Sequence, residues 1–154
     1  MAGELEYRGP GALSRRVDSP WREHTTIEGE RVTVAREGER ERRFSLRRAL
    51  ELRGLLGGFA ALLGGDRAAL EQVFEATLEA TGADWRLTLV PRDAALRRQL
   101  ASLVVNGRDA APRCFLSTEV DGDQSLMRVG AAAAWTDPPD AGLAALHARC
   151  TAAD

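Results

Sequence analysis

Side chains that could act as catalysts are few, and their spacing does not suit catalysis. The two histidines, His24 and His147, belong to no HxH or HExxH pattern and to no Cys/His cluster with metal-ligand spacing. A lone histidine is far more often a packing or surface residue than a general base. None of the serines lies in the GxSxG frame that exposes a hydrolase nucleophile: Ser14, Ser19, Ser45, Ser102, Ser117 and Ser125. The sequence therefore predicts no catalytic residue, no metal site and no enzyme.

The glycine-rich stretches suggest neither a phosphate site nor a calcium site. Gly57-Gly58 and Gly64-Gly65 are not followed by the Lys-Ser or Lys-Thr pair of a phosphate-binding loop. Asp121-Gly122-Asp123 does not begin a twelve-residue calcium loop, and a hairpin turn explains it fully. We expect no cofactor.

The two cysteines, Cys114 and Cys150, lie too far apart for a CxxC metal or redox motif. In an exported protein they could form a disulfide, and in the cytosol they would be two free thiols. The sequence leaves both alternatives open.

Charge argues against a nucleic-acid binder, although all 21 basic residues are arginine and arginine suits phosphate recognition. Residues 1–53 hold 12 Arg against 10 Asp and Glu, and residues 54–154 hold 9 Arg against 13. Neither part builds a strongly positive field, so nucleic acid ranks low as a partner. No apolar run reaches the roughly 20 residues that a membrane-spanning helix needs.

The first third of the chain predicts a meander of strands. Polar and apolar residues alternate around 3–8, 13–17, 21–27, 31–35 and 44–46, and turn signals recur between these runs. One face of this sheet is expected to be apolar, and the other to carry a solvated ladder of arginine and glutamate.

The middle of the chain predicts two helices. Leucines and a phenylalanine form an apolar stripe across residues 47–63, at Leu52, Leu55, Leu56, Phe59, Leu62 and Leu63. Asp66 is placed to cap a second helix, which is expected to run to Gly82 with its apolar face at Leu70, Val73, Phe74, Thr77 and Leu78.

The last third returns to strands. They are expected over residues 85–89, over 103–105 before a hairpin at Asn106-Gly107, over 115–120 before Asp121-Gly122, and over 126–135. A short helix or a wound connection is expected over residues 93–100, and a short terminal helix over residues 141–150.

These elements predict an α+β fold in which inserted helices cover a curved antiparallel sheet. We expect a single domain over residues 1–136, followed by a Pro-rich turn and a C-terminal tail over 137–154. The apolar stripe of the first helix is either plain core or the lining of a cavity for an apolar ligand.

Four stretches, taken in order, resemble the LolA-type periplasmic carriers of outer-membrane lipoproteins, and in particular their divergent LolA-like branch. GELEYRGPGALSRRVDSP is similar to the family's strand pair Gly-x-Leu-x-x-x-x-Pro-x-x-Leu, and TTIEGERVTV to the strand-turn-strand that follows. LLGGDRAALEQVFEATLEATGADWRLTLVPRD resembles the branch's Gly-Asp helix start and Trp-x-Leu-x-Leu-x-Pro strand, and GDQSLMRV a late strand. The similarity covers about residues 3–130.

The resemblance implies an incomplete, strongly curved antiparallel barrel with helices over its mouth. It also implies a periplasmic carrier that shields the acyl chains of lipoproteins or another lipid, loaded and unloaded by proteins of the inner and outer membranes. The family places a functional arginine directly before the first proline, where this chain has Gly9; Arg8 could make that polar contact only if the strand bulges.

Family members usually begin with a helix and strands upstream of Gly3, so we expect an N-terminally truncated domain with an open edge at residues 3–8. Such an edge invites strand addition, most simply by a second copy of the chain.

The side chains expected to line the apolar cavity and its lid come from both the strands and the helices. They are Leu5, Tyr7, Leu13, Trp21, Ile27, Val32, Val34, Leu52, Leu55, Leu56, Phe59, Leu62, Leu63, Phe74, Trp85, Leu87 and Leu89. The alternative is a non-enzymatic structural or protein-interaction module that uses its open sheet edge and binds no lipid.

Overall fold

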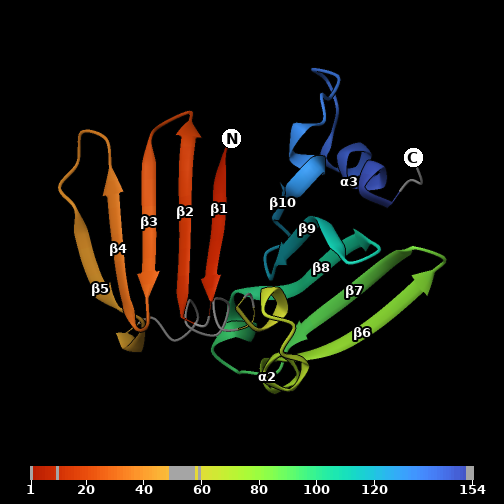
Figure 1. The fold of residues 1–154 in the computed structure, drawn as a ribbon, viewed down its shortest axis with the longest axis horizontal. Coiled ribbons are helices and arrows are strands. Elements are labelled where there is room, and N and C mark those ends of the chain that lie inside the picture. Colours follow the sequence, from red (N-terminus) through yellow and green to blue (C-terminus); the bar gives the residue numbers. More distant parts are fainter. Residues whose placement is uncertain (1, 10, 49–57, 59, 152–154) are drawn as a thin grey trace. The chain divides into compact units, whose positions relative to one another are not determined.

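Two compact units divide the chain, Met1–Val73 and Phe74–Asp154, and each contains its own antiparallel sheet (Figure 1). The computed structural model describes residues 2–9, 11–48, 58 and 60–151, without the side chains of Ala2 and Leu5. The α+β class with antiparallel sheets is confirmed, and both sheets are open rather than closed barrels.

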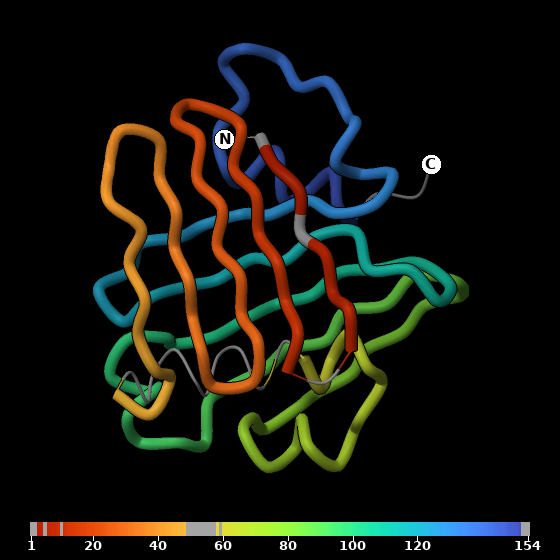
Figure 2. The backbone as a smooth tube through the Cα atoms, turned by 60° about the vertical axis from the view of Figure 1, so that its left-hand side comes forward, coloured from red at the N-terminus to blue at the C-terminus, as the bar shows by residue number. Residues whose placement is uncertain are grey.

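The first unit is a five-stranded meander in which each strand pairs with the next along the chain (Figure 2). Its strands are β1 (Ala2–Gly9), β2 (Ala12–Ser19), β3 (Glu23–Glu28), β4 (Arg31–Arg36) and β5 (Arg42–Ser45). Glycine occupies the tight turns because the backbone there needs a positive φ, which is +60° at Gly29 and +81° at Gly38. The alternation in the sequence predicted all five strands.

One face of this first sheet forms a hydrophobic core. Ile27 pairs across the strands with Leu13 on one side and Val32 on the other, so the three side chains share a face. Ile27, Val32 and Leu46 are buried, and Leu13 and Val34 pack against them. The opposite face is polar, as expected; there His24 Nε2 lies 2.9 Å from the hydroxyl of the buried Ser14.

Helical segments follow the meander. The 3-10 turn η1 (Leu46–Arg48) comes first, residues 58 and 60–63 are helical, and α2 (Arg67–Val73) ends the unit. Asp66 caps α2 as predicted, since its Oδ1 accepts a hydrogen bond of 3.0 Å from the Ala69 amide.

The second unit is a second five-stranded meander with the order β10-β9-β8-β7-β6 (Figure 1). Its strands are β6 (Phe74–Thr81), β7 (Asp84–Pro91), β8 (Leu100–Arg108), β9 (Ala111–Glu119) and β10 (Gln124–Arg128). The 3-10 turn η2 (Leu96–Arg98) lies in the connection where a short helix was expected.

The prediction of one helix from Asp66 to Gly82 was wrong beyond Val73. Phe74 to Thr81 form β6, which pairs residue by residue with β7 through a turn at Gly82, where φ is +62°. The stretch FEATLEAT also alternates apolar and polar residues, so it fits the two-residue repeat of a strand as well as the 3.6-residue repeat of a helix. Cross-strand pairing with β7 stabilises the strand, and the segment therefore forms β6.

Two further boundaries differ from expectation. Asn106 and Gly107 lie inside β8, beside a register shift, and the hairpin turns instead at Asp109, whose φ is +51°. The strand expected over residues 126–135 ends at Arg128, and residues Gly130–Ala134 form the 3-10 segment η3.

The C-terminal helix α3 (Leu143–Thr151), close to the helix expected over residues 141–150, contacts β8, β9 and β10. Cys150 on α3 forms a disulfide with Cys114 on β9, and both residues are buried. Of the two alternatives that the sequence left open, a disulfide and two free thiols, the structure has the disulfide.

Candidate functional site

The strongest candidate for a binding surface is one face of the second sheet, which we call the apolar face. Its register places Leu78, Leu87, Val105, Phe115 and Met127 in one row across the five strands. Since cross-strand partners project to the same side, these side chains form a continuous hydrophobic band.

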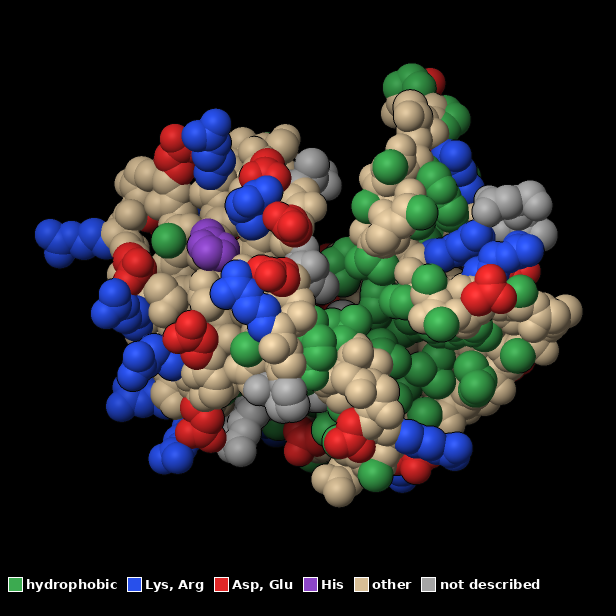
Figure 3. Space-filling view, in the orientation of Figure 1, with side chains coloured by type: hydrophobic (Ala, Val, Ile, Leu, Met, Phe, Trp, Pro, Cys, Tyr) green, Lys and Arg blue, Asp and Glu red, His purple; other side chains and the backbone are tan. Residues whose placement is uncertain are grey.

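A second row runs beside the first on the same face. Ala76, Leu89 and Leu103 occupy it over β6, β7 and β8, and Ser117 and Ser125 complete it over β9 and β10. The apolar face is therefore most hydrophobic over β6 to β8. Hydrophobic side chains gather over this sheet in Figure 3.

Accessibility varies across the apolar face. Leu89 and Val105 are fully buried, Leu87 is half-buried, and Leu78 on the edge strand β6 is 65% exposed. The exposed part of the face is the part that a ligand could reach.

Trp85 lies at one end of the apolar face, on the same side of β7 as Leu87 and Leu89. Its indole Nε1 donates a 2.9 Å hydrogen bond to the carbonyl of Asp109, which fixes the ring at the turn between β8 and β9. The ring lies over Gly107, where a Cβ atom would come within 2.1 Å of Trp85 Cζ2. The hydrogen bond leaves the apolar faces of the indole ring available for packing.

Of the remaining residues expected at the site, the structure places Phe74 and Leu89 on this apolar face, both buried. Sequence reasoning missed Leu78, Leu103, Val105, Phe115 and Met127. Their period-two spacing was the available signal, but Leu78 was assigned to a helix and Leu103 and Val105 to a very short strand.

The candidate residues of the first unit lie on its own apolar face. Tyr7, Leu13, Ile27 and Val32 share one row of the register, and Val34 lies in the next row. Trp21 lies outside the strands, in the turn between β2 and β3, where it is 45% exposed and the Arg36 guanidinium sits 5.2 Å from its ring centre.

The helical candidates fall partly within the described residues. Leu62 and Leu63 are helical and half-buried. Outside the described residues lie Leu52, Leu55, Leu56 and Phe59, together with the side chain of Leu5.

Arg8 stands at an irregularity of β1. The pairing of β1 with β2 shifts register between Tyr7 and Gly9, so the strand accommodates one extra residue at Arg8. The Arg8 side chain is exposed and pairs with Glu6 at 2.7 Å. This hydrogen bond, with the charge of Glu6 as a smaller cause, raises the pKa of Arg8. A polar contact made by Arg8 would therefore compete with Glu6.

The opposite face of the second sheet carries both polar and apolar side chains, with Arg86 and Asn106 beside Cys114 and Leu116, and it contacts α3. The Nε2 atom of His147 on α3 donates to Oδ1 of the buried Asn106 on β8 at 2.9 Å. Burial lowers the pKa of His147, and the nearby Arg86 guanidinium lowers it further. These groups hold α3 in place, and within the described residues no cluster of three or more His, Cys, Asp or Glu side chains could bind a metal ion.

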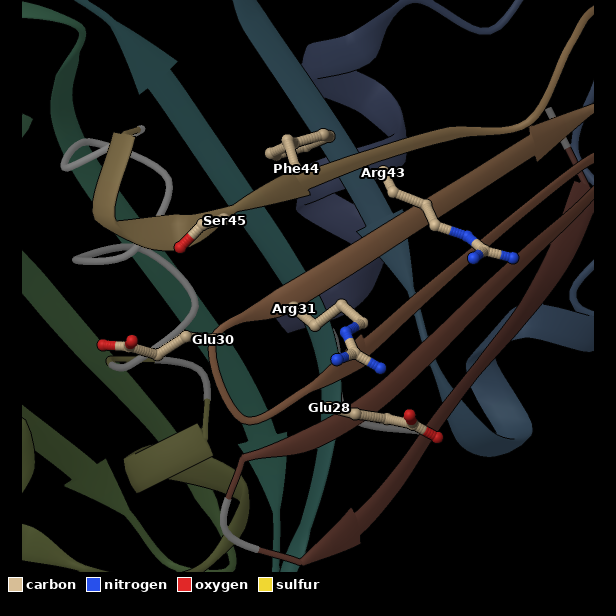
Figure 4. Close-up of a pocket in the computed structure, with 6 residues that line it drawn as sticks. All are labelled: Glu28, Glu30, Arg31, Arg43, Phe44 and Ser45. Carbon is tan, nitrogen blue, oxygen red and sulfur yellow. The ribbon is translucent and has the colours of Figure 1, made fainter.

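A surface pocket lies in the first unit where β3, β4 and β5 meet (Figure 4). It is lined by Glu28, Glu30, Arg31, Arg43, Phe44 and Ser45. Its lining is largely charged, which does not suit an acyl chain.

Each of the two units therefore offers a hydrophobic sheet face. Residues 1–152 match the family described as outer membrane lipoprotein carrier protein LolA-like. This chain belongs to that family.

The LolA-like family consists of carriers rather than enzymes, and the expectation drawn from the sequence motifs is confirmed at the level of the family. No curated protein matches this LolA-like chain. None of the helices in the part of the chain that the structure describes is long and apolar enough to cross a membrane.

Proposed function

We propose that this chain is a periplasmic carrier that holds the acyl chains of lipoproteins, or of another lipid, against its apolar sheet surfaces. The observation that carries the proposal is the apolar face of the second sheet in a chain of the LolA-like family. Each acyl methylene kept from water contributes about 0.8 kcal/mol, so hydrophobic contact alone can retain a lipid without covalent chemistry.

Each apolar sheet face is proposed to contact acyl chains, and the stripe predicted from the sequence over residues 47–63 is proposed to add to the lining. In this proposal that helical segment acts as a lid that opens for loading. Proteins of the inner and outer membranes would load and unload the carrier.

The test is lipid retention and binding. The chain is purified after export to the periplasm, examined by native mass spectrometry for bound lipid, and titrated with a fluorescent fatty acid. A retained lipid mass and saturable probe binding are expected. A protein that carries no lipid and does not bind the probe would rule the proposal out.

Two exposed apolar side chains on opposite faces of the second sheet provide a matched pair of variants. Leu78 is 65% exposed on the apolar face, and Val90 is 41% exposed on the other side of β7. Leu78→Asp is expected to weaken probe binding about tenfold because it places a charge beside the acyl chain. Val90→Asp is expected to leave binding unchanged; equal effects of both variants would contradict the assignment of the face.

A second candidate function rests on β1, which pairs with β2 alone and so forms one edge of the first sheet. In this alternative the chain is an interaction module, and β1 adds a strand from a partner, most simply a second copy. Analytical ultracentrifugation with hydrogen exchange tests it: dimers should form as concentration rises, and the β1 amides should become protected. A monomer with fast-exchanging β1 amides at all concentrations would exclude this self-association.

A further inference from the structure

The strand β6 forms an open edge of the second sheet. Among the described residues it pairs with β7 alone, and Figure 1 shows it at the outside of that sheet. All of its residues from Thr77 to Thr81 are exposed. An exposed edge strand can accept a further strand, and proteins often prevent this by making such strands short, irregular or charged.

β6 is more regular than the other edge strands. The edge strands β5 and β10 have four and five residues, whereas β6 has eight. β1 is as long as β6, but its pairing with β2 shifts register twice. The pairing of β6 with β7 runs residue by residue without a shift. Within the described residues, β6 therefore offers the most complete template for strand addition.

The hairpin turn determines which backbone groups of β6 face outward. The turn between β6 and β7 contains two residues, so the flanking pair, Thr81 and Asp84, is hydrogen-bonded, and such pairs alternate along the ladder. The amide and carbonyl groups of Ala76, Leu78 and Ala80 consequently point to the open side. No hydrogen bond in the described part of the chain engages these groups.

The outward-facing series ends at Phe74. The Phe74 carbonyl already accepts a 3.1 Å hydrogen bond from Arg92 Nε, and the Phe74 side chain is buried. An added strand is therefore expected to pair with residues 76–80. In two antiparallel β6 strands related by a two-fold axis, outward-facing residues must stand opposite outward-facing residues.

The glutamates of β6 select one alignment of two copies. With the axis at Thr77, Glu75 would stand opposite the partner's Glu79, and like charges directly opposite destabilise a sheet. With the axis at Leu78, Glu75 stands opposite the partner's Thr81, and Glu79 opposite the partner's Thr77.

The alignment centred at Leu78 also suits the neighbouring charge and the side chains of the apolar face. Glu79 has Arg86 directly opposite on β7, which offsets the negative charge near the new pairing. On the apolar face, Leu78 meets its own copy, and Ala76 meets the partner's Ala80. The edge is therefore complementary to a second copy of itself.

We propose that β6 pairs with β6 of a second copy of the chain, about a two-fold axis at Leu78. Such an axis runs perpendicular to the sheet, so both copies present their apolar faces on the same side. The row that contains Leu78, Leu87 and Val105 then continues into the same row of the partner. The inference goes beyond the carrier role, because it concerns a strand edge rather than the ligand of the apolar face.

The first test is self-association. Edge pairing buries little surface, so dimers are expected at roughly tens to hundreds of micromolar. Sedimentation velocity up to about 1 mM should show them, and hydrogen exchange should show protection of the amides of Ala76, Leu78 and Ala80 as concentration rises. A monomer over this whole range would overturn the inference, as would protection of β1 amides instead of β6 amides.

The second test is crosslinking with a short bismaleimide. Leu78→Cys should crosslink to its own copy, because hydrogen-bonded antiparallel partners have Cα atoms about 5.5 Å apart. Ala76→Cys is the matched control, because its two copies would lie roughly 14 Å apart. A mixture of Ala76→Cys and Ala80→Cys should crosslink. The native cysteines are joined to each other. Equal crosslinking of Leu78→Cys and Ala76→Cys would contradict the alignment.

A charge variant tests the same alignment without new cysteines. Thr77→Glu sets glutamate opposite the partner's Glu79 twice per dimer and should weaken dimerisation about tenfold. Gln124→Glu adds the same charge at an exposed position on β10, the other edge of the sheet, and should leave dimerisation unchanged. Thermal unfolding should show that both variants are folded. Equal weakening by both variants would count against the β6 edge.

Fatty-acid probe binding is measured on the same samples of unmodified protein. A monomer that binds the probe would retain the carrier function and overturn the β6 pairing. A dimer that is crosslinked through Leu78→Cys while the unmodified protein binds no probe would support the pairing and exclude the carrier function.

Discussion

The indole ring of Trp85 rests directly on Gly107, its cross-strand partner on β8. A Cβ atom at position 107 would lie 2.1 Å from one ring carbon, 2.4 Å from another and 2.7 Å from the carbonyl oxygen of Ala111. No side chain other than hydrogen fits there. The Trp85 ring therefore packs directly on the backbone of Gly107, and this contact explains why a glycine lies inside a strand.

Gly107→Ala is expected to destabilise the protein by about 1–3 kcal/mol, because the added methyl group forces the ring or the backbone to move. The displaced ring should also lose its hydrogen bond to Asp109. Urea unfolding followed by tryptophan fluorescence measures both effects. Gly142→Ala is the control, since nothing lies within 4 Å of a Cβ there, and it should change stability by less than about 0.5 kcal/mol.

Stability is expected to fall in mild acid because of His147. Burial and Arg86 lower the pKa of His147 in the folded state below its ordinary value of 6.5, so the unfolded chain takes up the proton first. The stabilisation is complete above pH 6.5 and decreases as the pH falls toward the lower folded-state pKa.

Urea unfolding between pH 5 and pH 8, as an approximate range around the histidine pKa, tests this dependence. His147→Gln should flatten the profile, while His24→Gln, at an exposed position on β3, serves as the matched histidine variant. A profile with the same slope in His147→Gln and in the unmodified protein would show that other groups cause the dependence.

The Cys114–Cys150 disulfide is expected to contribute about 2–4 kcal/mol by closing a loop of 36 residues. Cys114→Ala with Cys150→Ala should lower the unfolding midpoint and speed hydrogen exchange in α3. Reductant should lower the midpoint of the unmodified protein and leave that of the double variant unchanged. If reductant shifted both equally, the bond would not be the cause.

Asp137 joins two parts of the second unit through ion pairs. Its carboxylate accepts hydrogen bonds from the two terminal guanidinium nitrogens of Arg128, at the end of β10, and from Arg149 on α3 at 3.2 Å. Asp137→Asn should cost about 1–3 kcal/mol, since a partly buried bidentate pair is lost. Asp140→Asn, at an exposed aspartate three residues later, should be nearly neutral in the same unfolding assay.

The first sheet could be predicted from the sequence because each strand there carries both signals of a meander. Apolar residues alternate along the strands, and glycine stands at the turns, as at Gly29 and Gly38. Local signals and tertiary pairing agree in this part of the chain, so the strand boundaries differ by only a residue or two.

The second unit shows where local signals are insufficient. Val73, Phe74, Thr77 and Leu78 fit a helix as well as a strand, and pairing with β7 decided between them. Asn106-Gly107 has the composition of a hairpin turn, but its glycine is needed under Trp85. Only part of the apolar face could be predicted. Each of its rows contains residues from several strands, and the sequence of one strand does not determine how that strand aligns with its neighbours.

The attachment of α3 also has a genetic consequence. A premature stop codon at any position from 136 to 150 would remove Cys150 and leave Cys114 without its partner. The shortened product would lose the cover over Cys114 and carry a thiol able to join two molecules covalently. Nonsense mutations at positions 136 to 150 would therefore produce disulfide-linked aggregates rather than a slightly shorter carrier.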